Sequence, residues 1–184
     1  MSNITKRAMA QSLKKMLQIK DLDKITITDI TNDCGINRQT FYYHFKDIYD
    51  LLEWIFANEV VERIEKETTI ETWQENFRYV LNYMLKNKKF IIKTYNSLSR
   101  KTLLDFLFNQ YNTIFIEIVE NLSQNYNITK ENKIFIASFY KYGFAGIIEN
   151  WIITEMKESP ENIIKKLDVM ISGSFEEAVK KMSN

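Results

Sequence analysis

Apolar side chains recur every three or four residues along almost the whole chain, the spacing that places them on one face of an α-helix. Met9, Leu13 and Leu17 form one such stripe, and a longer one runs from Leu104 to Leu122. Strand-like alternation is not convincing anywhere, so we predict an all-α protein of about nine helices. The helices are expected near residues 9–17, 26–34, 37–45, 47–60, 72–85, 90–95, 99–122, 129–155 and from 159 onward.

The second of these segments has a well-marked start and end. Thr26 is placed to cap the helix, with Asp29 three residues later in a variant of the capping box. Ile25 and Ile30 occupy the two positions of a hydrophobic staple. Gly35 follows, and glycine readily adopts the left-handed conformation that ends a helix in a tight turn.

A short third helix follows this turn, with Asn37 as its N-cap. Phe41 and Phe45 are four residues apart, so they share a face and are expected to anchor the helix inward. Gln39 and Tyr43 lie nearly opposite that face. Two short helices joined by a glycine turn form a helix-turn-helix, whose second helix enters the major groove of DNA.

The outward side chains of this third helix have the chemistry that DNA reading requires. Gln39 is suited to bidentate bonding with adenine, and Thr40 to a thymine methyl or a base edge. Tyr42 and His44 are suited to phosphate oxygens, as are Lys46 and the N-terminus of the next helix, capped by Asp47. The predicted DNA-binding residues are Thr26, Thr28, Asn37, Arg38, Gln39, Thr40, Tyr42, Tyr43, His44 and Lys46.

Charge adds little to this picture. The 184 residues carry a net charge of +1, and 45% of them are hydrophobic, as in an ordinary soluble protein. Residues 1–50 carry eight basic and six acidic side chains, a mildly basic balance. With no secretory or membrane-spanning pattern and a single cysteine, Cys34, the sequence favours a cytoplasmic protein.

The segment "ITITDITNDCGINRQTFYYHFKDIYDLL" resembles the N-terminal DNA-binding domain of the TetR family of bacterial regulators. The resemblance covers about Ile4 to Phe56. It implies a homodimer with DNA-reading heads and a helical C-terminal domain that often binds a small effector. Two departures stand out. First, the family commonly has a phosphate-contacting lysine where Ile48 stands, and Lys46 is expected to take its role. Second, the family often has a small residue where Gln39 stands.

The C-terminal half extends the resemblance. "GFAGIIENWIITEMKESPENIIKKL" is similar to the last two helices of a Firmicutes-type branch, and "NRQTFYYHF" resembles regulators of dihydroxyacetone kinase operons within it. Gly143 and Gly146 lie within one helical turn, where glycine is costly, so close approach of another helix is expected. That helix belongs either to the same chain or to a second copy. We prefer a dimer interface that includes Gly143, Gly146, Ile147 and Met170.

We predict a helix-turn-helix DNA-binding domain over residues 1–50 and a helical effector-binding and dimerisation domain over 51–184, with the charged stretch 62–71 as their seam. The expected function is a sequence-specific transcriptional regulator, a repressor released by a small-molecule effector. The alternative is an activator controlled by a partner protein. The rival from another class is a helical enzyme or carrier that would use the aromatic residues after position 72 to hold a substrate. We expect most of these aromatic residues to belong to the core.

No catalytic, metal or cofactor motif supports that rival. His44, the only histidine, has no nucleophile motif beside it, and we interpret it as a DNA-flanking residue. Cys34 shares its helical spacing with Ile27 and Ile30 and is expected to face the core. An effector site among the aromatic residues would need a polar side chain such as Tyr95, Tyr111 or Asn150 for specificity, and the sequence does not single out any one ligand residue.

Overall fold

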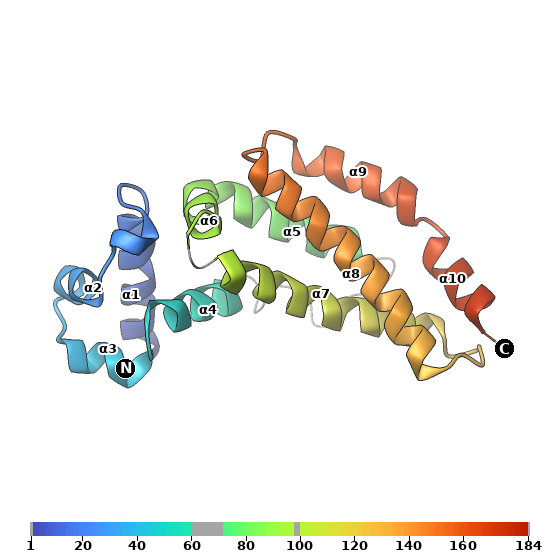
Figure 1. The fold of residues 1–184 in the computed structure, drawn as a ribbon, viewed down its shortest axis with the longest axis horizontal. Helices are drawn as coiled ribbons and strands as arrows, with labels where there is room; N and C mark the ends of the chain where they lie inside the picture. Colours follow the sequence, from blue (N-terminus) through green and yellow to red (C-terminus); the bar gives the residue numbers. More distant parts are fainter. Residues whose placement is uncertain (1, 60–71, 98–99, 184) are drawn as a thin grey trace. The chain divides into compact units, whose positions relative to one another are not determined.

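The structure, a computed structural model, describes residues 2–59, 72–97 and 100–183. Over these residues every regular element is a helix, which confirms the predicted all-α class (Figure 1). The elements are α1 (Ser2–Met16), the 3-10 turn η1 (Leu22–Lys24), α2 (Ile27–Cys34), α3 (Arg38–His44), α4 (Ile48–Glu59), α5 (Trp73–Lys86), α6 (Lys88–Tyr95), α7 (Arg100–Leu122), α8 (Lys130–Ile153), α9 (Pro160–Ile171) and α10 (Ser174–Met182). The predicted seam at 62–71 and the predicted helix start at Ser99 lie outside the described residues.

The helix starts follow from short polar side chains that satisfy the free backbone N–H groups of a first turn. Thr129 accepts a hydrogen bond from the N–H of Asn132, which confirms the predicted start of α8. Ser159 accepts from Asn162, and Pro160 takes the first helical position of α9, as predicted.

The predicted last helix is interrupted. α9 ends at Ile171, and Gly173 takes a left-handed φ of 74° before α10 begins at Ser174. A left-handed residue cannot continue a right-handed helix, so the chain turns there. The sequence pattern placed no second helix after this point, and α10 is an addition to the predicted architecture.

The first compact unit comprises Met1–Arg63 and Asn87–Phe106. In it α1 packs against α2 and α4, and α2 packs against α3 (Figure 1). Phe56 of α4 lies 5.5 Å from the ring of Phe90 in α6 and 5.1 Å from that of Phe106. The helix-turn-helix is therefore part of a unit with its own aromatic core.

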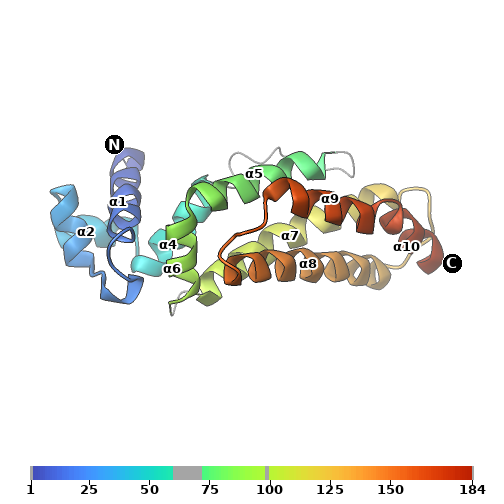
Figure 2. The same ribbon diagram turned by 90° about the horizontal axis from the view of Figure 1, so that it is seen from above.

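The second compact unit comprises Ile64–Lys86 and Leu107–Asn184. α5 packs on α9, and α10 contacts α8 and α9, while α8 and α9 run side by side (Figures 1 and 2). Its core is aromatic, with the ring of Phe115 4.9 Å from Phe144 and 5.8 Å from Phe175. The predicted functional division after residue 50 stays a prediction.

None of the described helices is long and apolar enough to cross a membrane.

Candidate nucleic-acid interface

The turn between α2 and α3 is built as the sequence predicts. Thr26 accepts from the N–H of Asp29 at 3.1 Å, and the Asp29 carboxylate accepts from the N–H of Thr26 at 2.9 Å, a reciprocal capping box. These hydrogen bonds hold the pKa of the Asp29 carboxyl below its ordinary value. Gly35 ends α2 with a left-handed φ of 65°. Local hydrogen bonds thus fix the start of α2, and the left-handed glycine fixes its end.

The cap of α3 uses one more side chain than predicted. The Asn37 side-chain oxygen accepts from the N–H of Thr40 at 2.8 Å and from the Thr40 hydroxyl at 3.0 Å. Thr40 is half-buried, so its hydroxyl is already engaged in the cap and its outward role is reduced.

The two faces of α3 are separated as predicted. Phe41 and Phe45 are buried, with exposed fractions of 0% and 2% and ring centroids 5.9 Å apart. On the opposite side Tyr43 is 83% exposed, and Gln39 is exposed as well. The helix therefore presents a polar, aromatic surface on a scaffold that two phenylalanines hold in place.

The remaining predicted contact residues surround this surface. Arg38 donates to the Tyr42 hydroxyl at 3.4 Å, so these two side chains support each other one turn apart. The ring of His44 lies 4.9 Å from that of Tyr43, and His44 is half-buried. The exposed members of the predicted set are Thr26, Thr28, Asn37, Arg38, Gln39, Tyr42, Tyr43 and Lys46.

The start of α4 is capped by Asp47, as predicted. The N–H of Asp50 is bonded to the Asp47 carboxylate at 2.9 Å, and the N–H of Lys46 to the Asp50 carboxylate at 2.9 Å. Two carboxylates at this end would repel a phosphate. Ile48, which stands where the family commonly has lysine, is half-buried and lines a hollow of about 230 Å³ with Leu22 and other side chains.

Cys34 is only half-buried, where the sequence predicted a core position. Burial still raises the pKa of its thiol above the ordinary value. No group of histidine, cysteine and carboxylate side chains in the described ranges could hold a metal ion.

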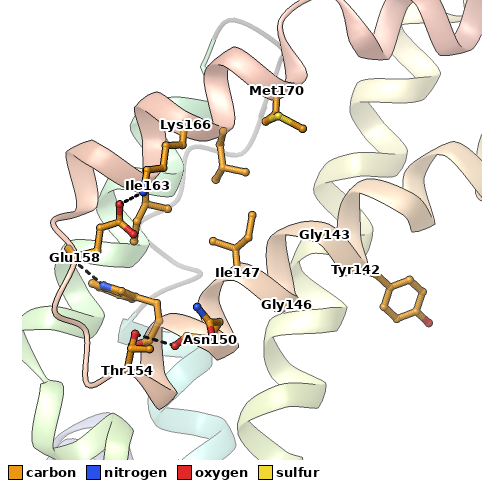
Figure 3. Close-up of a pocket in the computed structure, with 12 residues that line it drawn as sticks. Tyr142, Gly143, Gly146, Ile147, Asn150, Thr154, Glu158, Ile163, Lys166 and Met170 are labelled. Atoms are coloured by element: carbon orange, nitrogen blue, oxygen red, sulfur yellow. Dashed lines mark hydrogen bonds and ion pairs between the residues drawn. The ribbon is translucent and has the colours of Figure 1, made fainter.

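A second surface lies on α8 and α9. Gly143 and Gly146 are exposed, and a Cβ added at either position would meet no described atom within 4 Å. Among the described residues there is therefore no close packing at this glycine pair, which was one of its two explanations. Both glycines line a groove of about 640 Å³ with Ile147 and Met170, which is 74% exposed (Figure 3).

Comparison with known proteins agrees with this architecture. Residues 71–173 match the TetR-type family model described as "Transcriptional regulator C-terminal region". The match spans more than half of the chain, which therefore belongs to the TetR family of transcriptional regulators.

Individual relatives agree with the family. The chain is 27% identical over 154 residues to the HTH-type dhaKLM operon transcriptional activator DhaS of Lactococcus lactis subsp. lactis (strain IL1403), covering 83% of this chain and 81% of that protein. A solved structure described as the dihydroxyacetone kinase operon activator DhaS has a TM-score of 0.71 at 24% identity, over 98% of this chain and 99% of its own. NalD, described as the secondary repressor of the MexAB-OprM multidrug efflux pump in Pseudomonas aeruginosa, has a TM-score of 0.51 at 14% identity, with 93% and 96% coverage.

The protein is thus a DNA-binding transcriptional regulator. Its family and structural neighbours are regulators rather than enzymes. The relatives include both an activator and a repressor, so the sign of regulation differs among proteins of this fold.

Proposed function

We propose that this regulator acts in the cytoplasm as a homodimer, with α3 of each copy in the major groove of one half of a near-palindromic operator. The observation that carries the proposal is the exposed face of α3, where Gln39 and Tyr43 stand opposite the buried Phe41 and Phe45. A groove-reading helix needs such a face, because the side chains that touch bases cannot also hold the helix to its domain.

Gln39 supplies the chemistry for direct base reading, since its amide matches the acceptor and donor of adenine. Tyr43 stands four residues later on the same face and extends the surface by an aromatic ring and a hydroxyl. We assign phosphate contacts to Arg38, Tyr42 and the threonines near the start of α2, Thr26 and Thr28, because all four side chains are exposed.

Replacing Gln39 and Tyr43 by alanine tests this assignment. Each substitution should weaken binding to an operator selected from random duplexes, by about 1–3 kcal/mol where a bidentate contact is lost, and relax the preference at one base position. The matched controls are Gln124→Ala and Tyr126→Ala, which remove the same side chains from the loop before α8. Unchanged affinity and unchanged preference in the α3 variants would refute the base-reading role.

For dimerisation, the glycine pair of α8 supports contact with a second copy. The surface at Gly143 and Gly146 is open, and Ile147 and Met170 beside it expose apolar area (Figure 3). Symmetric pairing through this face would bury that area and let two α8 backbones approach closely. In such a dimer the two glycines would pack against the partner helix, whereas the described residues of the single chain provide no such contact.

The double variant Gly143→Ala/Gly146→Ala distinguishes a freely exposed helix surface from a dimer interface. In an exposed helix each change should stabilise the fold by about 0.5–1 kcal/mol, because alanine is the better helix former. In a close interface the added methyl groups should instead raise the dimer dissociation constant at least tenfold, a rough expectation from overpacking. Analytical ultracentrifugation measures this, and unchanged association would exclude this face as the interface.

For regulation, we propose a repressor that a small effector releases from DNA. Tyr111 supports an effector site in the second unit. Its hydroxyl is buried and has no hydrogen-bond partner among the described residues, and Phe77, Phe115 and Phe144 lie about 6 Å from its ring. Such surroundings suit an aromatic molecule with a single acceptor that takes the phenol hydrogen bond.

Monocyclic aromatic ketones are suitable probes, because the carbonyl accepts one hydrogen bond. They should raise the melting temperature of the protein and lower its operator affinity, and Tyr111→Phe should reduce both effects. If operator binding is unaffected by every probe, the alternative gains support. That alternative is an activator controlled by a partner protein, as the description of the Lactococcus relative as an activator suggests. A promoter fusion in cells with and without the regulator gives the sign directly.

A further inference from the structure

The basic side chains of the first unit fall into two groups. One group is neutralised by ion pairs: Lys14 with Glu59 at 2.5 Å, and Lys15 with Asp33 at 2.7 Å. Lys20 and Lys24 are paired in the same way with aspartates at 3.6 Å. These cations lie in the C-terminal half of α1 and the turns that follow it.

The other group has no ion pair with any carboxylate in the described ranges. It includes Arg38 and Lys46, which stand at the two ends of α3, and Lys6 in the first half of α1. The net charge of the chain is close to zero, but these three unneutralised cations lie on α1 and at the ends of the recognition helix. The same unit has further cations without an ion pair in the described ranges, Arg7 in α1, Lys88 and Lys89 in α6 and Lys101 in α7. A sequence count of charges does not reveal this separation.

Lys6 reaches that position through its contacts with two aromatic rings. Its ammonium lies 5.5 Å from the ring centroid of Phe45, which caps the C-terminus of α3, and 5.9 Å from that of Trp54 in α4. An aromatic face attracts a cation without neutralising it, so the charge remains available to a phosphate.

The neighbouring elements explain why a cation is suited to this place. The C-terminus of a helix carries a partial negative charge, which favours a lysine beside the end of α3. Lys6 is half-buried, which is typical of a lysine that packs its stem against protein and keeps its charged end in contact with water. In contrast, the carboxylates of Asp47 and Asp50 occupy the start of α4, where they would repel a phosphate.

We propose that Lys6 binds a DNA backbone phosphate next to the C-terminal end of α3. The contact rests on the proposed docking of α3 in the major groove. It is a positioning contact and carries no base information, because phosphates are the same at every sequence. Phe45 and Trp54 hold the ammonium in place before DNA arrives.

The test is the salt dependence of binding, measured with a selected operator and with a random 30-base-pair duplex. Each phosphate contact contributes about 0.9 to the slope of log affinity against log salt, which corresponds to about eightfold in affinity at 0.1 M relative to 1 M salt. Lys6→Gln keeps most of the stem and removes the charge. It should lower this slope by about 0.9 for each bound head and weaken both duplexes equally.

Two variants serve as matched controls. Lys6→Arg keeps the charge and should retain the slope. Lys15→Gln makes the same chemical change on the same helix, but at a lysine already paired with Asp33, and should leave the slope unchanged. Melting temperatures of all three variants report any loss of packing at the aromatic rings.

An unchanged slope in Lys6→Gln, even with weaker binding, would overturn the proposal and leave Lys6 a packing role only. An equal fall in Lys15→Gln would also overturn it, since overall charge would then suffice. A different outcome would refute only the proposed base-reading role of α3. In that outcome Gln39→Ala and Tyr43→Ala bind DNA as the wild type does, while Lys6→Gln lowers the slope of log affinity against log salt. If the wild-type protein shows no salt-dependent DNA binding, both proposals fall together.

Discussion

The Tyr111 hydroxyl gives a quantitative test of the second core. This phenol is 4% exposed, and its oxygen has no partner among the described residues. A buried polar group left unsatisfied costs about 1–3 kcal/mol relative to its hydrated state. Phenylalanine removes the oxygen and keeps the ring contacts, so Tyr111→Phe should raise the free energy of unfolding by about 1–2 kcal/mol.

Urea unfolding followed by tryptophan fluorescence measures this change, since Trp73 and Trp151 lie in the same unit. The melting temperature should rise by about 2–4 °C for each kcal/mol. Tyr126→Phe in the half-exposed loop before α8 is the matched control and should change neither quantity.

The difference should also depend on pH. Burial raises the pKa of Tyr111 far above its ordinary value of 10.0, so the folded protein keeps this phenol protonated when the unfolded chain already ionises. Stability from this group is complete below about pH 10 and is lost as the pH rises further. The advantage of Tyr111→Phe over the wild type should therefore grow above pH 10. A destabilised Tyr111→Phe variant would show that the hydroxyl is hydrogen-bonded in solution. A constant difference across this range would show that the phenol ionises as readily in the folded protein as in the unfolded chain.

Three further outcomes follow from the first unit. Thr26→Ala removes one half of the capping box and should lower the free energy of unfolding by about 1 kcal/mol, measured in urea; no change would mean that the box does not stabilise α2. The hydrogen bond from Lys15 holds the pKa of Asp33 low, so Lys15→Ala should raise that pKa in a carbon-13 NMR titration. The low pKa of Asp33 contributes stability that is present above its ordinary pKa and is lost as the pH falls through the folded pKa. This contribution to the free energy of unfolding should therefore diminish in Lys15→Ala. Because burial raises the pKa of the Cys34 thiol, iodoacetamide at pH 7.5 should alkylate it more slowly in the native protein than in urea, and equal rates would contradict the half-buried position.

The local features of the helix-turn-helix could be predicted because their partners are close in sequence. Thr26 and Asn37 each bond a backbone N–H three residues later, and Gly35 needs only its own conformation. The inward face of Phe41 and Phe45 follows from helical spacing. Such features depend on a single turn of chain, so no tertiary information was needed.

The remaining features depend on contacts between distant segments. Lys6 and Phe45 are far apart in sequence, and only the packing of α1 against its neighbours brings them together. Spacing alone placed Cys34 in the core, where the structure leaves it half-buried. Gly143 and Gly146 predicted the close approach of another helix. Whether that helix belongs to the same chain or to a second copy depends on tertiary packing, which the spacing of apolar residues does not encode.

On α3, the residues that stabilise the helix are different from those that face outward, and this has a consequence for how such regulators diversify. The residues that stabilise the helix, Asn37, Phe41 and Phe45, are different from those that face outward, Gln39 and Tyr43. Substitution at the outward positions therefore costs the fold little, and mutational drift there is limited only by the operator. Duplicated copies of such a gene could acquire new targets through a few changes on one helical face, and a library randomised at Gln39 and Tyr43 should consist mostly of folded proteins.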